Sequence, residues 1–202
     1  MIDNLQHIKE LLNFEKPGDF YYCLILKRKK DQPEDERENH QSVRTIKSYC
    51  IESIEQLEKR YNEIKQLCEV FNARAYIHVQ KQNHYDISLI MLSTLANRIQ
   101  DGSHRQQGLF DSVVGKLKTH EKRWIVDIDT KDQDYINEVT TFINTQCRPI
   151  QEKVHKVIPT KSGYHLITSK FDMLKFKKKY PDIDLQKKNP TLLFLPNSLN
   201  NE

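Results

Sequence analysis

Apolar residues recur along the chain with two periods, and these periods divide it into expected helices and strands. Spacings of three and four predict helices over residues 3–14, 54–71, 87–99 and 132–146, and a lysine-rich segment predicts another over residues 171–180. Shorter apolar or alternating runs predict strands over residues 19–29, 42–51, 74–82, 123–129, 152–160, 164–170 and 191–196. Ser53 and Gln56 have the spacing of a capping box at the start of the second helix.

The order of these elements favours one α+β domain, with a mixed or antiparallel sheet and helices packed on one face. Residues 19–29 and 42–51 are expected to form a hairpin around the polar loop 31–41, and a second loop is expected over residues 100–108. The helix over 87–99 is apolar on most of its circumference, which predicts that it is buried.

Composition excludes several classes of protein. The chain has 202 residues, of which 37% are hydrophobic and 30% are charged, and a formal net charge of +4, so it is long enough for a real core. No apolar run approaches the length of a membrane span, and the first residues do not form a signal peptide, so a cytoplasmic protein without membrane contact is expected. The four cysteines are dispersed without a CxxC pair, which argues against a zinc ribbon and for reduced thiols.

The segment RWIVDIDT places two acids in a strand that otherwise suits a core. Side chains alternate along a strand, so Asp127 and Asp129 point to the same face, about 7 Å apart at their Cα atoms. Two carboxylates on one face repel each other unless a positive group holds them, and Mg²⁺ and Mn²⁺ prefer such oxygen ligands. The alternative is that Asp129 caps the following helix, which would explain one acid but not both.

The segment PTKSGYHLIT supplies groups that suit phosphate. Lys161 offers a positive charge, Ser162 a hydroxyl and Gly163 a close backbone approach, and His165 follows on the next strand. The alternatives are an ordinary hairpin turn and a hydrogen-bonded histidine within a sheet. A single helix and a single strand separate this segment from the DID motif, so both groups can meet on one sheet face.

Together these motifs resemble those of the archaeo-eukaryotic primase superfamily, including the primase-polymerases of plasmids and phages. In that family the first motif binds a divalent metal, the second contacts the phosphates of the incoming nucleotide, and a hydrophobic residue followed by an acid completes the metal site. Here Ile183-Asp184 is similar to the third motif, with Asp182 as a rival acid. The segment FLPNSLN is similar to a proline-containing segment of some members, but it lacks the arginine that usually precedes the proline.

The resemblance implies an RRM-like catalytic sheet beside a smaller N-terminal α/β unit. Residues 1–202 would form one domain, with the N-terminal part at about 1–119 and the catalytic motifs at about 120–202. The implied reaction is nucleotidyl transfer in replication on a single-stranded DNA template, with nucleoside triphosphates as substrates and a helicase or other replication protein acting in trans. The implied roles are metal binding and catalysis by Asp127, Asp129 and Asp184, and triphosphate binding by His165, Ser162, Lys161 and Gly163.

Basic residues outside the motifs are candidates for nucleic-acid contact. The lysines of the last expected helix, Lys175, Lys177, Lys178 and Lys179, could meet template phosphates, although a solvated lysine-rich face is the simpler interpretation. Arg74 is a weaker candidate, for which an exposed strand arginine is the simpler interpretation.

Two other functions remain open. A rolling-circle initiator nuclease would need a His-hydrophobic-His pair and a nucleophilic tyrosine, and YIHVQ contains only His78. A non-catalytic nucleic-acid-binding or partner-docking domain on a primase-like fold is the other.

Overall fold

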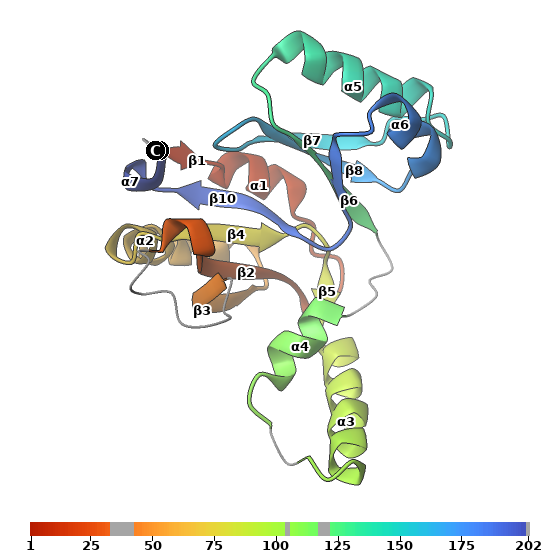
Figure 1. The fold of residues 1–202 in the computed structure, drawn as a ribbon. Helices are drawn as coiled ribbons and strands as arrows, with labels where there is room; N and C mark the ends of the chain where they lie inside the picture. The colour runs from red at the N-terminus through yellow and green to blue at the C-terminus, as the bar shows by residue number, and fades with distance from the viewer. Residues whose placement is uncertain (33–42, 104–105, 117–121, 201–202) are drawn as a thin grey trace.

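The protein, described here from a computed structural model over residues 1–32, 43–103, 106–116 and 122–200, contains two antiparallel sheets with helices packed on them (Figure 1). In the first sheet the order is β1–β10–β4–β2–β3, with β5 paired to β2, and in the second it is β7–β8–β6–β9. The strands of the first sheet are β1 (Ile2–Asp3), β2 (Asp19–Arg28), β3 (Val43–Ile51), β4 (Arg74–His78), β5 (Gln82–Asn83) and β10 (Pro190–Leu195). The strands of the second are β6 (Arg123–Ile128), β7 (Val154–Pro159), β8 (Tyr164–Ser169) and β9 (Asp184–Gln186).

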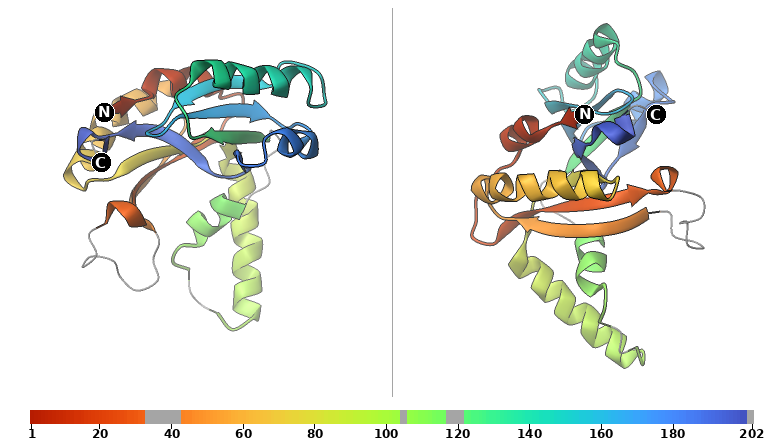
Figure 2. Two further views of the ribbon diagram at one scale, coloured as in Figure 1. Left: turned by 45° about the horizontal axis from the view of Figure 1, so that its top comes forward. Right: turned by 90° about the vertical axis from the view of Figure 1, so that its left-hand side faces the viewer.

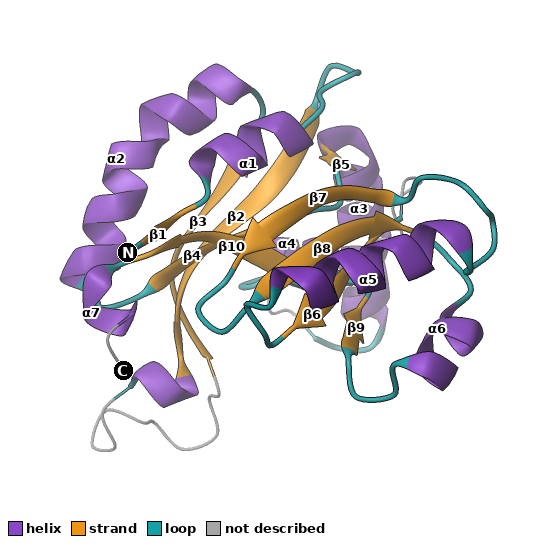
Figure 3. Ribbon diagram, turned by 90° about the horizontal axis from the view of Figure 1, so that it is seen from above, coloured by secondary structure: helices purple, strands orange, loops and turns teal. Residues whose placement is uncertain are grey.

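The helices divide between the two sheets and a projecting arm. They are α1 (Leu5–Leu11), the 3-10 turn η1 (Lys29–Asp31), α2 (Ile54–Val70), α3 (His84–Gln100), α4 (Leu109–Lys116), α5 (Gln133–Thr145), α6 (Met173–Lys179) and α7 (Asn197–Asn200). Viewed from above, α1 and α2 lie over the first sheet and α5 lies over the second (Figure 3), whereas α3 and α4 extend away from both sheets (Figure 2).

The expected helix start at Ser53 is confirmed. The Ser53 Oγ atom accepts a hydrogen bond from the Gln56 amide nitrogen at 3.1 Å, and the Gln56 side chain accepts one from the Glu52 amide nitrogen at 2.6 Å. The first bond satisfies a backbone donor that the first turn of a helix leaves without a partner, and the second holds the backbone of the residue before the cap. The helix then buries Leu57, Tyr61, Ile64 and Cys68 at the spacing of one face.

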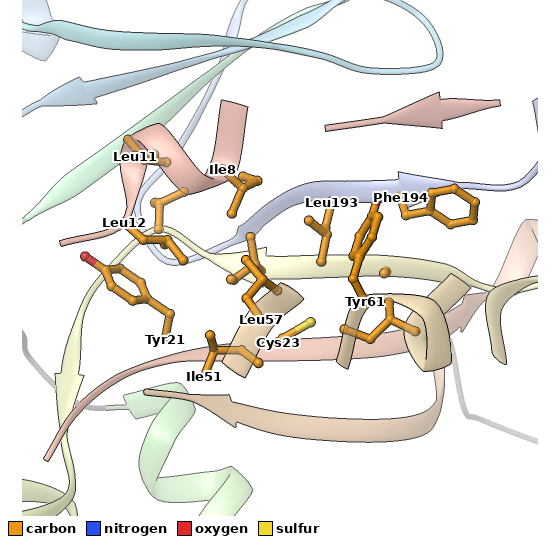
Figure 4. Close-up of a cluster of buried hydrophobic side chains, with 14 of the residues drawn as sticks. Ile8, Leu11, Leu12, Tyr21, Cys23, Ile51, Leu57, Tyr61, Leu193 and Phe194 are labelled. Carbon is orange, nitrogen blue, oxygen red and sulfur yellow. The ribbon is translucent and has the colours of Figure 1, made fainter. Parts of the chain in front are cut away.

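Strand β6 serves two cores at once. Ile125 belongs to the large core that joins α1, α2 and the first sheet (Figure 4), and Ile158 and Ile167 of the second sheet also join it. Trp124 and Val126, on the opposite face, belong to the core under α5 and α6. Burial on both faces explains why Trp124, Ile125 and Val126 are all apolar. The charged residue Asp127 then interrupts this run one position before the strand ends.

The expected α+β class is therefore confirmed, and of the two sheet types that were expected the structure shows the antiparallel one, but in two sheets and not in one. The last strand adds a feature that the sequence did not predict. Strand β10 lies between β1 and β4 of the first sheet, although its residues follow the second sheet in the chain. The parts before and after residue 119 thus share one sheet and one core.

Several expectations about individual elements were wrong. The expected strand over residues 74–82 is two short strands, β4 and β5. The helix expected over 87–99 is longer, and among its residues only Ile87 is buried, because α4 covers just one of its sides. The sequence analysis did not predict α4, α7, β1, β9 or η1. Most of the expected loop 31–41 lies outside the described residues.

Helices also do not all pack on one face. Phe20 and Tyr22 of β2 contact the arm formed by α3 and α4, whereas their neighbour Tyr21 faces the core under α1 and α2. Among the helices described, none is both long enough and apolar enough to cross a bilayer.

Candidate functional site

A cleft of about 680 Å³ lies between the two sheets. Its first wall is the face of the first sheet opposite α1 and α2, since the lining residues on β2, β4 and β10 alternate with residues of the large core. Its second wall comes from the second sheet and from the turn between β7 and β8. The lining residues that matter below are Arg28, Arg74, Tyr76, Asp127, Asp129, Lys161, Ser162, His165, Gln186 and Asn189.

Asp127 stands at the centre of a row of polar residues across three strands. Its register partners are His165 on β8 and Asp184 on β9, so the three side chains share one face of the sheet. The His165 Nε2 atom lies 3.4 Å from the Asp127 Oδ1 atom, and the other ring nitrogen lies 2.9 Å from the Thr191 Oγ1 atom. His165 is buried, so its ring is held between β6 and β10.

The surroundings favour the charged form of Asp127. The pKa of its carboxyl group is lowered first by the hydrogen bond with His165 and then by the charges of His165 and Arg28, with a smaller effect of the Gln186 amide. Partial burial opposes these effects but does not overcome them. The cleft therefore contains a carboxylate, that of Asp127, which is ionised at neutral pH.

Gln186 links this acid to Asp184. Its Nε2 atom donates to the Asp127 Oδ2 atom at 3.1 Å and to the Asp184 Oδ2 atom at 2.9 Å. Asn189 donates to the Gln186 Oε1 atom at 3.0 Å, which turns the amide so that its nitrogen faces the two acids. One donor thus lies within hydrogen-bonding reach of both carboxylates. Asp182 precedes β9 and has no partner on β6, which favours Asp184 over its rival as the third acid.

Asp129 lines the same cleft from a position just beyond the end of β6. The interpretation of Asp129 as a helix cap was wrong, because Asp132 caps α5 by accepting from the amide nitrogens of Asp134 and Tyr135. Within the described ranges, no three or more His, Cys, Asp or Glu side chains lie together as a ready metal-binding group. The acids accordingly form a bridged pair, with Asp129 nearby, and not a preformed triad.

The turn between β7 and β8 depends on Gly163. A Cβ atom at this position would lie 1.9 Å from the Ile128 carbonyl oxygen, so only glycine lets the turn approach the end of β6 this closely. The turn is closed by the Thr160 amide nitrogen, which donates to the Gly163 carbonyl at 2.8 Å. This close approach brings Lys161 and Ser162 to the cleft that holds Asp129. Ser162 is exposed, and Lys161 donates to the Leu199 carbonyl at 2.7 Å.

Two arginines of the first sheet line the same cleft as Asp127 and Asp129. Arg28 lines the cleft and its charge helps to lower the pKa of Asp127. Arg74 is buried and forms two hydrogen bonds with Asp31, at 2.8 Å and 2.6 Å, so its interpretation as an exposed strand residue was wrong. Arg74 is therefore fixed in the wall by an ion pair, whereas Arg28 lies at the end of its strand.

The lysines of α6 do not line the cleft. The helix packs through Phe176 into the core under α5, on the face of the second sheet opposite Asp127. Lys177 donates to the carbonyls of Pro181 and Ile183, and Lys179 pairs with Glu138. Lys175 and Lys178 are exposed, and their role in nucleic-acid binding stays a prediction.

Sequence reasoning overlooked several residues of the site, chiefly Arg28, Tyr76, Gln186 and Thr191. Gln186 carried a usable signal, because it stands two residues after Asp184 and would share its face in a strand. That strand is only three residues long and was not predicted. Thr191 carried no signal, since its contact with His165 depends on β10 returning to the first sheet.

The chain matched no family model, no curated protein and no solved structure.

Proposed function

We propose that this chain is a metal-dependent nucleotidyltransferase that starts or extends a strand on a single-stranded nucleic-acid template. One observation carries the proposal: Asp127 and Asp184 share a single hydrogen-bond donor in the cleft that also holds basic and hydroxyl groups suited to phosphate. The motif resemblance to primase-polymerases supports the same reaction.

The chemistry of the acids fits a hard divalent cation such as Mg²⁺ or Mn²⁺. Carboxylate oxygens are the ligands these ions prefer, and a point within reach of both Asp127 and Asp184 already exists, because the Gln186 nitrogen contacts both. Asp129 lines the same cleft as Asp127 and is our proposed third ligand, whereas Asp184 is exposed and is not among the residues that line the cleft. When bound, such an ion lowers the pKa of an attacking hydroxyl and stabilises the charge that leaves with pyrophosphate.

The same cleft also contains groups that fit a polyphosphate. Arg28 and Lys161 contribute positive charge, and Ser162 contributes an exposed hydroxyl donor. In the bond from Lys161 to the Leu199 carbonyl only the donor is charged, and it can be exchanged for a stronger bond to phosphate in which both partners are charged. His165, held by Asp127 and Thr191, keeps its imidazole oriented at the floor of the site.

A second candidate function is a non-catalytic nucleic-acid-binding or partner-docking domain. The observation that favours it is that the neutral Gln186 amide donates to both Asp127 and Asp184, so the two acids already share a hydrogen-bond partner within the chain. A fold that had lost catalysis would keep such a neutral bridge, whereas an enzyme must exchange it for a cation. The two functions therefore differ in whether divalent metal and nucleotide are used.

A strand-extension assay separates them. The chain is incubated with Mn²⁺ or Mg²⁺, primed or unprimed single-stranded DNA and labelled nucleotides, and we expect labelled product. The double variant Asp127→Ala, Asp129→Ala should lower incorporation by roughly a hundredfold or more, because metal ligation contributes several kcal/mol to such transition states. Its far-ultraviolet circular dichroism should match that of the wild type.

The control for this variant is Asp182→Ala. Asp182 is exposed and does not line the cleft, so its loss should leave incorporation unchanged. Wild-type protein that binds single strands but incorporates nothing, with either metal and with a helicase added, would favour the non-catalytic domain.

A further inference from the structure

Helix α3 carries a stripe of exposed apolar residues that no part of the described chain covers. Tyr85, Leu89, Leu92, Ala96 and Ile99 follow one another at alternating intervals of four and three. This is the spacing of a coiled-coil seam. The large members of the stripe, Tyr85, Leu89, Leu92 and Ile99, are 70%, 49%, 66% and 54% exposed.

The stripe is distinct from the side of α3 that packs within the chain. Ile87 is buried in a cluster with Leu109 and Val113 of α4, and Met91 and Leu95 pack against that cluster. On a helix of 3.6 residues per turn Ile87 lies nearly opposite the centre of the stripe, Met91 about a third of a turn from it and Leu95 about a quarter of a turn from it. Helix α3 is therefore apolar on two sides, and α4 accounts for only one of them.

We propose that the exposed stripe of α3 is a self-association surface, on which the α3 helix of a second copy of this chain packs antiparallel. An apolar seam with a period of 3.5 residues fits another helix with the same period. A second α3 provides such a seam, and a twofold arrangement covers both stripes at once.

The helix dipoles favour the antiparallel direction. Antiparallel pairing sets the positive N-terminal end of each α3 beside the negative C-terminal end of its partner, whereas parallel pairing would bring like ends together. The charged residues Asp86 and Arg98 stand outside the series of the stripe, so the seam itself carries no charge.

The position of the arm permits this contact. Helices α3 and α4 extend away from both sheets (Figures 1 and 2), so two arms can pair along their length while the bodies remain apart. The cleft between the sheets is not lined by any residue of α3 or α4, so pairing leaves it open.

The area predicts a weak dimer. A large aliphatic side chain offers on the order of 100 Å² of apolar surface and a tyrosine more, so the stripe and its flanking residues bury about 1,000 Å² in a pair of arms. That value is at the low end of specific interfaces, where weak and transient complexes lie.

Other occupants fit the stripe less well. A helix that lies on a bilayer usually carries several lysines or arginines on its polar face, whereas α3 has only Arg98. Nucleic acid fits the stripe of α3 no better, because binding its phosphates requires several positive charges on the helix.

Sedimentation velocity of the full chain, from about 1 µM to about 1 mM, tests the proposal. We expect a monomer at the low end and a dimer at the high end. Leu92→Glu, at the middle of the stripe, should keep the chain monomeric throughout, because it places two carboxylates close together in the interface. Leu92→Ala removes apolar area without adding charge, so it should weaken association roughly tenfold. This second variant tests the stripe even if Leu92→Glu fails to fold.

Asn97→Glu is the matched control. It adds the same charge to an exposed position of α3 about a third of a turn from the stripe, so the dimer should persist. A chain that stays monomeric at the highest concentration would overturn the proposal, as would a dimer that Leu92→Glu leaves intact. Binding of the monomer to vesicles of neutral and anionic phosphatidyl lipids, lost in Leu92→Glu, would assign the stripe to a membrane surface instead.

Discussion

Gly163 determines how closely the β7–β8 turn approaches the acids of β6. Sequence reasoning singled out this glycine as a place where backbone can approach a ligand. The structure instead gives it a contact within the protein, because the backbone of Ile128 and Thr130 occupies the space that a side chain would need. A glycine in the segment that we propose to bind phosphate can thus serve the site by positioning its neighbours Lys161 and Ser162.

Gly163→Ala should therefore destabilise the protein and displace the turn. A methyl group 1.9 Å from a carbonyl oxygen forces the backbone to move, at a cost of about 1–3 kcal/mol or more in the free energy of unfolding. The measurement is urea unfolding followed by circular dichroism. Gly115→Ala is the control, because nothing lies within 4 Å of its added Cβ atom and helix α4 favours alanine over glycine. Equal stability of the two variants would contradict the packing described for the turn.

The residues that could be predicted at this scale are those whose partners are close in sequence. Asp127, Asp129 and the KSGYH segment stood out because their spacing within one strand or turn already implies a common face. The bridge from Gln186 to Asp127 joins residues 59 positions apart, and the contact of His165 with Thr191 requires β10 to return to the first sheet. Such contacts are set by tertiary pairing, which leaves no local pattern.

Among the elements, the strands and helices with a strong period were predictable and the short ones were not. Helices α2 and α5 bury one clear face and were expected within a few residues of their bounds. Helix α3 was expected to be buried because its apolar residues surround the helix axis. The outer side of α3 is exposed because, among the described residues, α4 packs only on the other side of this helix. The period of apolar residues predicts a helix with apolar sides, but it does not show whether a second element packs on it.

The end of β4 provides a prediction about pH. Burial lowers the pKa of His78 to about 4, with only partial compensation from a backbone hydrogen bond to Lys188. An unfolded histidine has a pKa of about 6.5, so the unfolded chain takes up this proton first as the pH falls. The stability contributed by neutral His78 is complete above pH 6.5 and is lost as the pH falls toward 4, by up to about 3 kcal/mol.

His78→Gln should accordingly flatten the decline in stability between pH 6.5 and pH 4. The measurement is denaturant unfolding at several pH values across this interval. His155→Gln, at an exposed position of β7, controls for the loss of a histidine as such. A variant that declines as steeply as the wild type would show that burial of His78 does not govern this range.

For the molecule as a whole, β10 is the element that makes the cleft possible. It crosses from the second sheet into the first, where it lies between β1 and β4, contributes Thr191 beside His165, and lines the cleft through Pro190 and Leu192. Residues of both sheets thereby line one cleft. Composition and element order predicted an α+β chain with a mixed or antiparallel sheet, but the insertion of the last strand between β1 and β4 could not be predicted from them.

The central claim is that the cleft binds a divalent cation together with the phosphates of a nucleotide. Anomalous diffraction from crystals soaked with Mn²⁺ and a non-hydrolysable nucleoside triphosphate tests it most directly. We predict a manganese peak in contact with the carboxylates of Asp127 and Asp184, the Gln186 amide turned away from them, and phosphate density near Lys161 and Ser162. Crystals that show no manganese at these acids, with Gln186 still bridging them at saturating Mn²⁺ and nucleotide, would contradict the claim.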